Sequence, residues 1–110
     1  MQKNHLAITA RKGLHFIKRA EILYCCSEGA YTNIYLENNR KLTVSKNLKE
    51  VEATLQDEQF VRIHASHLVN LEHTVGYLNN NYNCVQMSNG EVLAVARSRK
   101  QAFMNCFVRL

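Results

Sequence analysis

The chain has 110 residues, a length typical of a single domain that can bury a core of its own. Lys and Arg number 14 against nine Asp and Glu, and the resulting net charge of +5 favours a polyanionic partner. No apolar run approaches the roughly 18 residues of a membrane span, and no signal-peptide core follows the polar residues 1–5, so we expect a cytoplasmic protein.

Nothing in the composition indicates a domain boundary within the chain. Proline is absent, the glycines are scattered, and there is no linker or internal repeat, so we expect one domain over residues 1–110. The four cysteines have no regular spacing. They indicate reduced, mostly buried thiols and no disulfide framework.

The first half of the chain predicts two hairpins and a buried strand between them. Residues 6–17 alternate apolar and polar side chains on either side of a glycine-containing turn, which predicts the first hairpin. Residues 22–26 form an uninterrupted apolar run, typical of a strand that is buried on both faces. Residues 31–44 predict the second hairpin, because Asn38 and Asn39 suit a tight turn.

One helix follows. Apolar residues recur at i, i+3 and i+7 between Leu48 and Leu55, which places them on one stripe of a helix. Asn47 is a favourable N-cap, and Glu50 is placed to complete a capping box with it. We therefore predict a helix near residues 47–56.

Residues 60–70 look like the centre of the chain's organisation. An apolar strand pattern begins at residue 60, and we expect this strand to be the central one. Two imidazoles and a hydroxyl interrupt the pattern at residues 64–67. These groups could form hydrogen bonds to an anion from a short loop between two strands. The alternative is that Arg62 and His64 only line a solvated sheet face and Ser66 caps a turn.

The last third of the chain predicts three more strands. Short apolar runs occupy residues 74–78, 85–87 and 92–95, and an Asn-rich turn is expected at residues 79–81. The dipeptide Asn89-Gly90 predicts a hairpin with a type I′ turn, since both residues tolerate a positive φ.

A cluster of cations follows the last predicted strand. Residues 97–100 read Arg-Ser-Arg-Lys, and no other Lys or Arg occurs between Arg62 and this cluster. Phe103, Phe107 and Leu110 then recur at helical spacing, so we predict a short C-terminal helix that covers the core.

The residues give little support for an enzyme. The acids stand in polar, turn or exposed helical contexts, away from the apolar surroundings that paired catalytic carboxylates need. His64, His67 and His73 match metal-ligand spacing only loosely, and no Cys-x-x-Cys accompanies them. Cys25 and Cys26 lie in an apolar run where thiols are usually inert. We expect no catalytic site, metal or cofactor.

Four blocks of the sequence together resemble the LytTR family, the DNA-binding output domain of many bacterial response regulators. They are residues 21–24 with 28–32, residues 45–50, residues 60–70 and residues 90–100. The third block, with its Arg-x-His-x-Ser-x-x-Val-Asn pattern, is the most specific. The resemblance implies a mostly β, elongated fold of about ten short strands in small stacked sheets, with one helix.

The resemblance also implies that loops enter two successive major grooves of DNA. By position, the residues that read bases would be Ala30 or Tyr31, Ala65 and Arg97. Arg97 is the best candidate because a guanidinium can bind guanine O6 and N7 together. Two positions depart from the family, because Ala65 replaces a polar or basic residue and His67 replaces an aromatic one. The candidates for backbone phosphate contact are Lys46, Asn47, Arg62, His64, Ser66, His67, Ser98, Arg99 and Lys100.

The family resemblance sets expectations about partners. We expect a transcriptional regulator that binds double-stranded DNA at direct repeats, as a dimer on DNA and as a monomer in free solution. No receiver domain is present in the sequence, so the chain is either an excised output domain or a stand-alone regulator. Two other readings stay open: a basic module that binds an acidic protein, and an RNA or single-strand binder. The latter would stack bases on Tyr24, Tyr31, Tyr35 and Tyr77.

Overall fold

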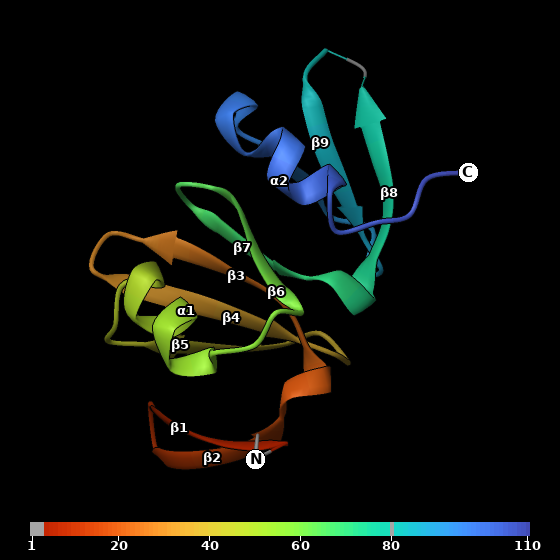
Figure 1. Cartoon of the computed structure of the whole chain (residues 1–110). Helices are drawn as coiled ribbons and strands as arrows, with labels where there is room; N and C mark the ends of the chain where they lie inside the picture. The colour runs from red at the N-terminus through yellow and green to blue at the C-terminus, as the bar shows by residue number, and fades with distance from the viewer. Residues whose placement is uncertain (1–3, 80) are drawn as a thin grey trace.

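A computed structural model describes residues 4–79 and 81–110, so the predicted polar lead at residues 1–3 and Asn80 of the predicted Asn-rich turn lie outside it. The described residues form ten strands, two short α-helices and three 3-10 turns (Figure 1). In chain order the elements are β1 (His5–Ala10), β2 (Gly13–Lys18), η1 (Arg19–Glu21), β3 (Ile22–Glu28), β4 (Tyr31–Leu36), β5 (Arg40–Val44), α1 (Leu48–Leu55), β6 (Phe60–His64), β7 (His67–Asn70), η2 (Leu71–His73), β8 (Thr74–Asn79), β9 (Asn83–Met87), β10 (Val92–Ala94), η3 (Arg97–Arg99) and α2 (Lys100–Met104).

The largest sheet is antiparallel and has the strand order β5-β4-β3-β7-β6. Strand β3 occupies its centre and is buried on both faces, as its apolar run predicts, because Ile22 and Cys25 belong to one core cluster while Leu23 and Tyr24 belong to the other. The expectation of a central strand at residue 60 is wrong. Strand β6 pairs only with β7 and lies at the edge of the sheet.

The first core lies between this sheet, the β1–β2 hairpin and α1. In Figure 1 the hairpin lies below the sheet and α1 lies against one face of it. The predicted stripe Leu48, Val51 and Leu55 is buried in this core. The helix begins as predicted: the Glu50 backbone N–H donates to Asn47 Oδ1 at 2.9 Å, and the Asn47 N–H donates to Glu50 Oε1 at 3.1 Å.

The second core lies on the other face of the large sheet, under a three-stranded sheet of order β10-β9-β8 and helix α2. Phe103 is buried there and packs on Tyr77, with ring centroids 6.1 Å apart. The predicted C-terminal helix is shorter than its apolar spacing indicates, since α2 ends at Met104 and leaves Phe107 and Leu110 exposed. Of the four thiols, Cys25 and Cys84 are buried and Cys26 is half-buried, whereas Cys106 is exposed.

The two asparagine turns form differently. Asn38 and Asn39 both have positive φ, at 63° and 59°, in the predicted tight turn, which joins the paired residues Leu36 and Arg40. At Asn89-Gly90 only the glycine does, with φ 91°. The Gly90 N–H donates to the Met87 carbonyl and the Met87 N–H donates to the Glu91 carbonyl. The turn therefore has three residues and ends in a left-handed glycine, so the predicted type I′ geometry is wrong.

Candidate nucleic-acid interface

Three loops meet at one end of the five-stranded sheet. The Ser27 N–H near the end of β3 donates to the Ser66 carbonyl in the β6–β7 loop at 3.0 Å. The Thr32 hydroxyl at the start of β4 donates to the Lys46 carbonyl in the β5–α1 loop at 2.7 Å. These bonds hold the β3–β4 turn beside both other loops, although the three segments are far apart in the sequence.

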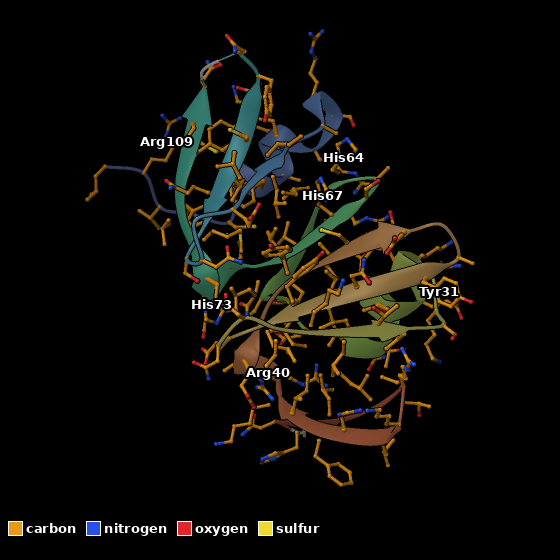
Figure 2. The ribbon with its side chains drawn as sticks, turned by 180° about the vertical axis from the view of Figure 1, so that it is seen from behind. Tyr31, Arg40, His64, His67, His73 and Arg109 are labelled. Carbon is orange, nitrogen blue, oxygen red and sulfur yellow. The ribbon has the colours of Figure 1, made fainter. Side chains whose placement is uncertain are left out.

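The cationic segment after β10 joins the same end of the molecule. The Ala96 N–H, immediately before η3, donates to the Ile63 carbonyl at 2.8 Å. We call the combined surface of residues 28–31, 45–47, 64–67 and 97–100 the loop face. In Figure 2, Tyr31, His64 and His67 lie along one side of the molecule, whereas Arg40, His73 and Arg109 lie away from it.

The four residues that the family resemblance implies for base reading all lie exposed on the loop face. Ala30 and Tyr31 are at the tip of the β3–β4 turn, and the Tyr31 side chain is 51% exposed. Ala65 is at the tip of the β6–β7 loop, and Arg97 opens η3. Because these residues are exposed, they are accessible to a binding partner.

The residues predicted to contact phosphates differ in their exposure and in whether their side chains already have partners. Lys46, Ser98 and Lys100 are exposed and Arg99 is half-buried. The Lys100 ammonium lies over the Tyr77 ring, 5.8 Å from its centroid, which places this cation beside the second core. Asn47 is exposed, but its side-chain oxygen is occupied as the N-cap of α1.

Arg62 is engaged inside the protein. Its guanidinium donates to the His64 carbonyl at 2.9 Å and to the Ala65 carbonyl at 2.6 Å. It also forms a 3.1 Å ion pair with Glu52 of α1. The Arg62 side chain is only 17% exposed. It therefore does not line a solvated face; it binds the backbone of the β6–β7 loop and ties that loop to α1.

The two histidines of the loop are ordered by their neighbours. The Ser66 N–H donates to His64 Nδ1 at 3.0 Å, so a neutral His64 carries its proton on Nε2. The His67 ring lies 5.0 Å from that of His64. Burial, with a smaller effect of His64, lowers the pKa of His67 below its usual 6.5, against a hydrogen bond with Ser66 that raises it. His67 is thus uncharged at neutral pH.

Some contacts of the loop face have no signal in the sequence. Cys26 Sγ lies 3.5 Å from His67 Nδ1, and burial raises the pKa of this thiol to about 11, so it is protonated and unreactive. Glu52 anchors Arg62 across ten residues. Both partnerships follow from how β3, β7 and α1 pack, which no local spacing reveals.

The tyrosines do not form an exposed stacking platform. Tyr24 is buried and stacks on Tyr35 with centroids 4.7 Å apart, and Tyr77 packs on Phe103 in the second core. Of the four rings named for single-strand stacking, only Tyr31 is largely exposed. In residues 4–79 and 81–110 no three His, Cys, Asp or Glu side chains gather as metal ligands, and no helix is long and apolar enough to cross a membrane.

These features define a small β-rich domain with exposed cations among the loops on one face. The sequence profile of the LytTr DNA-binding domain matches residues 12–107, and the chain belongs to this LytTR family. It is a family of DNA-binding domains and not of enzymes.

Two relatives show how far the similarity extends. The chain is 27% identical over 99 residues to the sensory transduction protein LytT of Bacillus subtilis (strain 168). That match covers 87% of this chain and 40% of the relative, so the chain spans less than half of that protein. A solved LytTr DNA-binding domain from Bacillus cereus, described as part of a methyl-accepting/DNA response regulator, has the same fold. It gives a TM-score of 0.80 at 23% identity, covering 94% of this chain and 95% of that one.

Proposed function

We propose that this domain binds double-stranded DNA sequence-specifically, by placing its loops in successive major grooves, and thereby regulates transcription. The observation that carries the proposal is the convergence of four segments on one loop face. The longest dimension of the domain is 42 Å. That length is comparable with the roughly 34–36 Å between successive major grooves on one side of B-DNA, which supports a domain large enough to contact two of them.

The loop residues are assigned different roles according to their exposure and to the hydrogen bonds that they already make. The exposed tips Tyr31, Ala65 and Arg97 are assigned to base edges, with Ala30 beside them, because only side chains at tips reach the floor of a groove. Backbone phosphates are assigned to the remaining donors and cations, which set register without reading sequence. They are Lys46, Asn47, His64, Ser66, His67, Ser98, Arg99 and Lys100. Arg62, whose guanidinium holds two loop carbonyls, is assigned to positioning the loop instead of phosphate contact.

The wider context follows from the relatives. Because the similar proteins are named for sensory transduction and response regulation, we propose that this domain is the DNA-binding output of a response regulator, under the control of a receiver domain. We propose direct repeats as its target, with two domains side by side on DNA and a monomer in free solution.

Arg97 and Lys100 provide the test. A duplex selected from a random pool by the wild-type domain serves as the specific site, and an unselected duplex serves as the reference. In fluorescence anisotropy, Arg97→Ala is expected to weaken specific binding by about 1–3 kcal/mol and to spare the reference duplex. Lys100→Ala, the matched loss of one charge, should weaken both equally. Equal losses on both duplexes for Arg97→Ala would remove Arg97 from base reading, and no selectable site would refute sequence-specific binding.

A further inference from the structure

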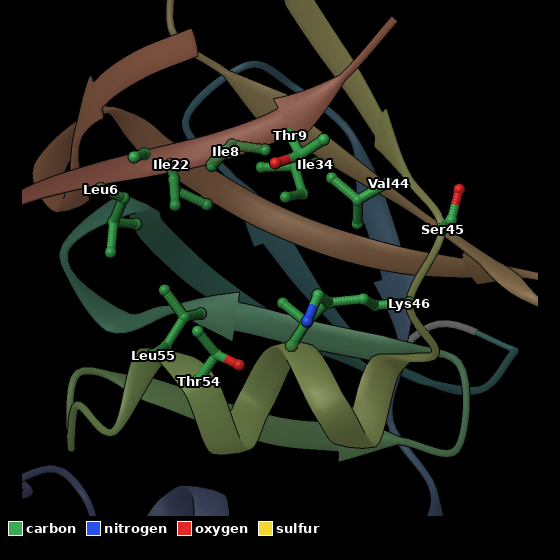
Figure 3. Close-up of a pocket in the computed structure, with 12 residues that line it drawn as sticks. Leu6, Ile8, Thr9, Ile22, Ile34, Val44, Ser45, Lys46, Thr54 and Leu55 are labelled. Atoms are coloured by element: carbon green, nitrogen blue, oxygen red, sulfur yellow. The ribbon is translucent and has the colours of Figure 1, made fainter. Parts of the chain in front are cut away.

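A cavity of about 410 Å³ lies between β1, the five-stranded sheet and α1 (Figure 3). Its volume falls within the range of small-molecule sites, about 300–1,000 Å³. Eight of its twelve lining residues are apolar, among them Leu6, Ile8, Val44 and Leu55.

The cavity exists because the β1–β2 hairpin covers the sheet incompletely. Leu6 and Ile8 point toward the first core but remain half-buried, whereas Ile22 and Ile34 beneath them are fully buried. The hairpin therefore forms one wall and α1 the opposite wall of an apolar space that stays open on one side.

The cavity lining carries only positive charge. Lys46 is its one charged residue, and no acid lines the cavity among the described residues. Figure 3 shows Ser45 at one end of the cavity and Leu6 and Leu55 at the other, with the Lys46 side chain running from the Ser45 end inward over α1. The Lys46 backbone is fixed by the Thr32 hydroxyl on its carbonyl. A cation over α1 and aliphatic walls around Leu6 and Leu55 complement a molecule with an anionic head and an apolar tail.

We propose that this cavity binds a single-chain aliphatic carboxylate, with its carboxylate on the Lys46 ammonium and its alkyl tail directed toward Leu6 and Leu55. The Ser45 hydroxyl also lines the cavity, whereas the Thr54 hydroxyl is already used, because it donates to the Glu50 carbonyl at 2.9 Å. Burial of each methylene should strengthen binding by roughly fourfold, as expected for about 0.8 kcal/mol.

Occupation of the cavity has a consequence for the loop face. Lys46 belongs to both sites, so a carboxylate on its ammonium removes one cation from the DNA surface. This step rests on the proposed function, whereas ligand binding itself does not. Because linkage is reciprocal, bound DNA weakens ligand binding by the same factor.

The first experiment is an NMR titration of the isotope-labelled domain with decanoate below its micelle concentration, without DNA. We expect saturable shifts confined to residues that line the cavity, such as Ile8 and Val51, and roughly fourfold weaker binding for each methylene removed. Decylammonium should bind at least tenfold more weakly than decanoate. Shifts spread over other surfaces, or equal affinity for the two head groups, would overturn the proposal.

Three variants sharpen the test. Lys46→Gln should weaken decanoate binding at least tenfold, while Lys49→Gln, a loss of the same charge on the exposed side of α1 outside the lining, should not change it. Thr54→Trp places a bulky ring in the lining from an exposed helix position and should abolish binding in a folded domain. Undiminished binding by both Lys46→Gln and Thr54→Trp refutes the site.

Competition with DNA separates the two proposals. A wild-type domain saturated with decanoate should bind duplex DNA several-fold more weakly, and Thr54→Trp should lose this inhibition while it still binds DNA. Saturable cavity shifts in a domain that binds no DNA would support the ligand site and refute the proposed function. DNA binding without any cavity shifts would do the reverse.

Discussion

Arg62 shows how the role of a cation follows from its partners. Its guanidinium bridges two carbonyls of the β6–β7 loop and Glu52 of α1. We predict that Glu52→Gln weakens specific DNA binding severalfold, because the guanidinium loses its anchor. Simple electrostatics predicts the opposite sign, since the substitution removes a negative charge near a polyanion. Anisotropy with the selected duplex distinguishes the two.

The salt dependence of the Arg62→Ala variant supplies the control. If Arg62 positions the loop, this variant binds the selected duplex more weakly but keeps the wild-type slope of log K against log salt. Lys46→Gln, which removes a proposed phosphate contact, should make the slope about 0.9 smaller in magnitude. A slope reduced by that amount in Arg62→Ala would return Arg62 to the phosphate contacts.

His67 should make stability depend on pH. Its pKa is lowered in the folded domain, mainly by burial, so the unfolded chain binds the proton more readily. The favourable contribution is complete above the unfolded pKa, near 6.5, and is lost as pH falls through the folded pKa. We predict that wild-type stability decreases from neutral to mildly acidic pH, and that His67→Phe decreases less. Urea denaturation of both proteins at several pH values checks this, and parallel profiles would contradict it.

For single residues, the sequence predicts which side chains are exposed but not which groups they contact. The blocks around Tyr31, Ala65 and Arg97 could be located from the family resemblance alone. The partners Glu52 of Arg62 and Cys26 of His67 could not, since one depends on where α1 packs and the other on the pairing of β3 with β7. Knowing these partners changes the proposed role of Arg62 from phosphate contact to positioning of the β6–β7 loop.

Helix α1 combines a folding signal with a proposed DNA contact in one residue. The Asn47 side chain caps the helix and also lies on the loop face. We predict that Asn47→Ala lowers the free energy of unfolding by about 1 kcal/mol, because the Glu50 N–H loses its acceptor. Asn47→Asp should keep this stability, since a carboxylate caps equally well. Urea denaturation measures both.

The same pair of variants separates capping from DNA contact. Asn47→Asp places a negative charge against the proposed phosphates, so it should weaken DNA binding even though the helix is intact. Full DNA affinity in Asn47→Asp would exclude a phosphate near this position.

Local rules predict elements well where the determinants are local. The capping box of α1 and the turn at Asn38 and Asn39 form as their sequences indicate. The turn at Asn89-Gly90 does not, because only Gly90 adopts a positive φ there. The place of β6 at the sheet edge is set by pairing partners, which an apolar run does not specify.

For the whole molecule, β3 is the shared structural element. Its two faces bury separate cores, one beneath the hairpin and α1 and the other beneath β8–β10 and α2. Backbone hydrogen bonds join the end of β3 to the β6–β7 loop and the residue before η3 to β6. The loop face therefore combines segments that pack against different cores and meet through β3 and its neighbours.

The net charge of +5 and the cations of the loop face give a last prediction. With about six phosphate contacts, the affinity for duplex DNA should fall about a thousandfold between roughly 50 and 200 mM salt, because each contact releases condensed counterions. On a direct repeat, sedimentation should detect two domains per duplex, while the free domain sediments as a monomer. A shallow salt dependence together with a dimer in free solution would indicate that the cations face a protein partner instead of DNA.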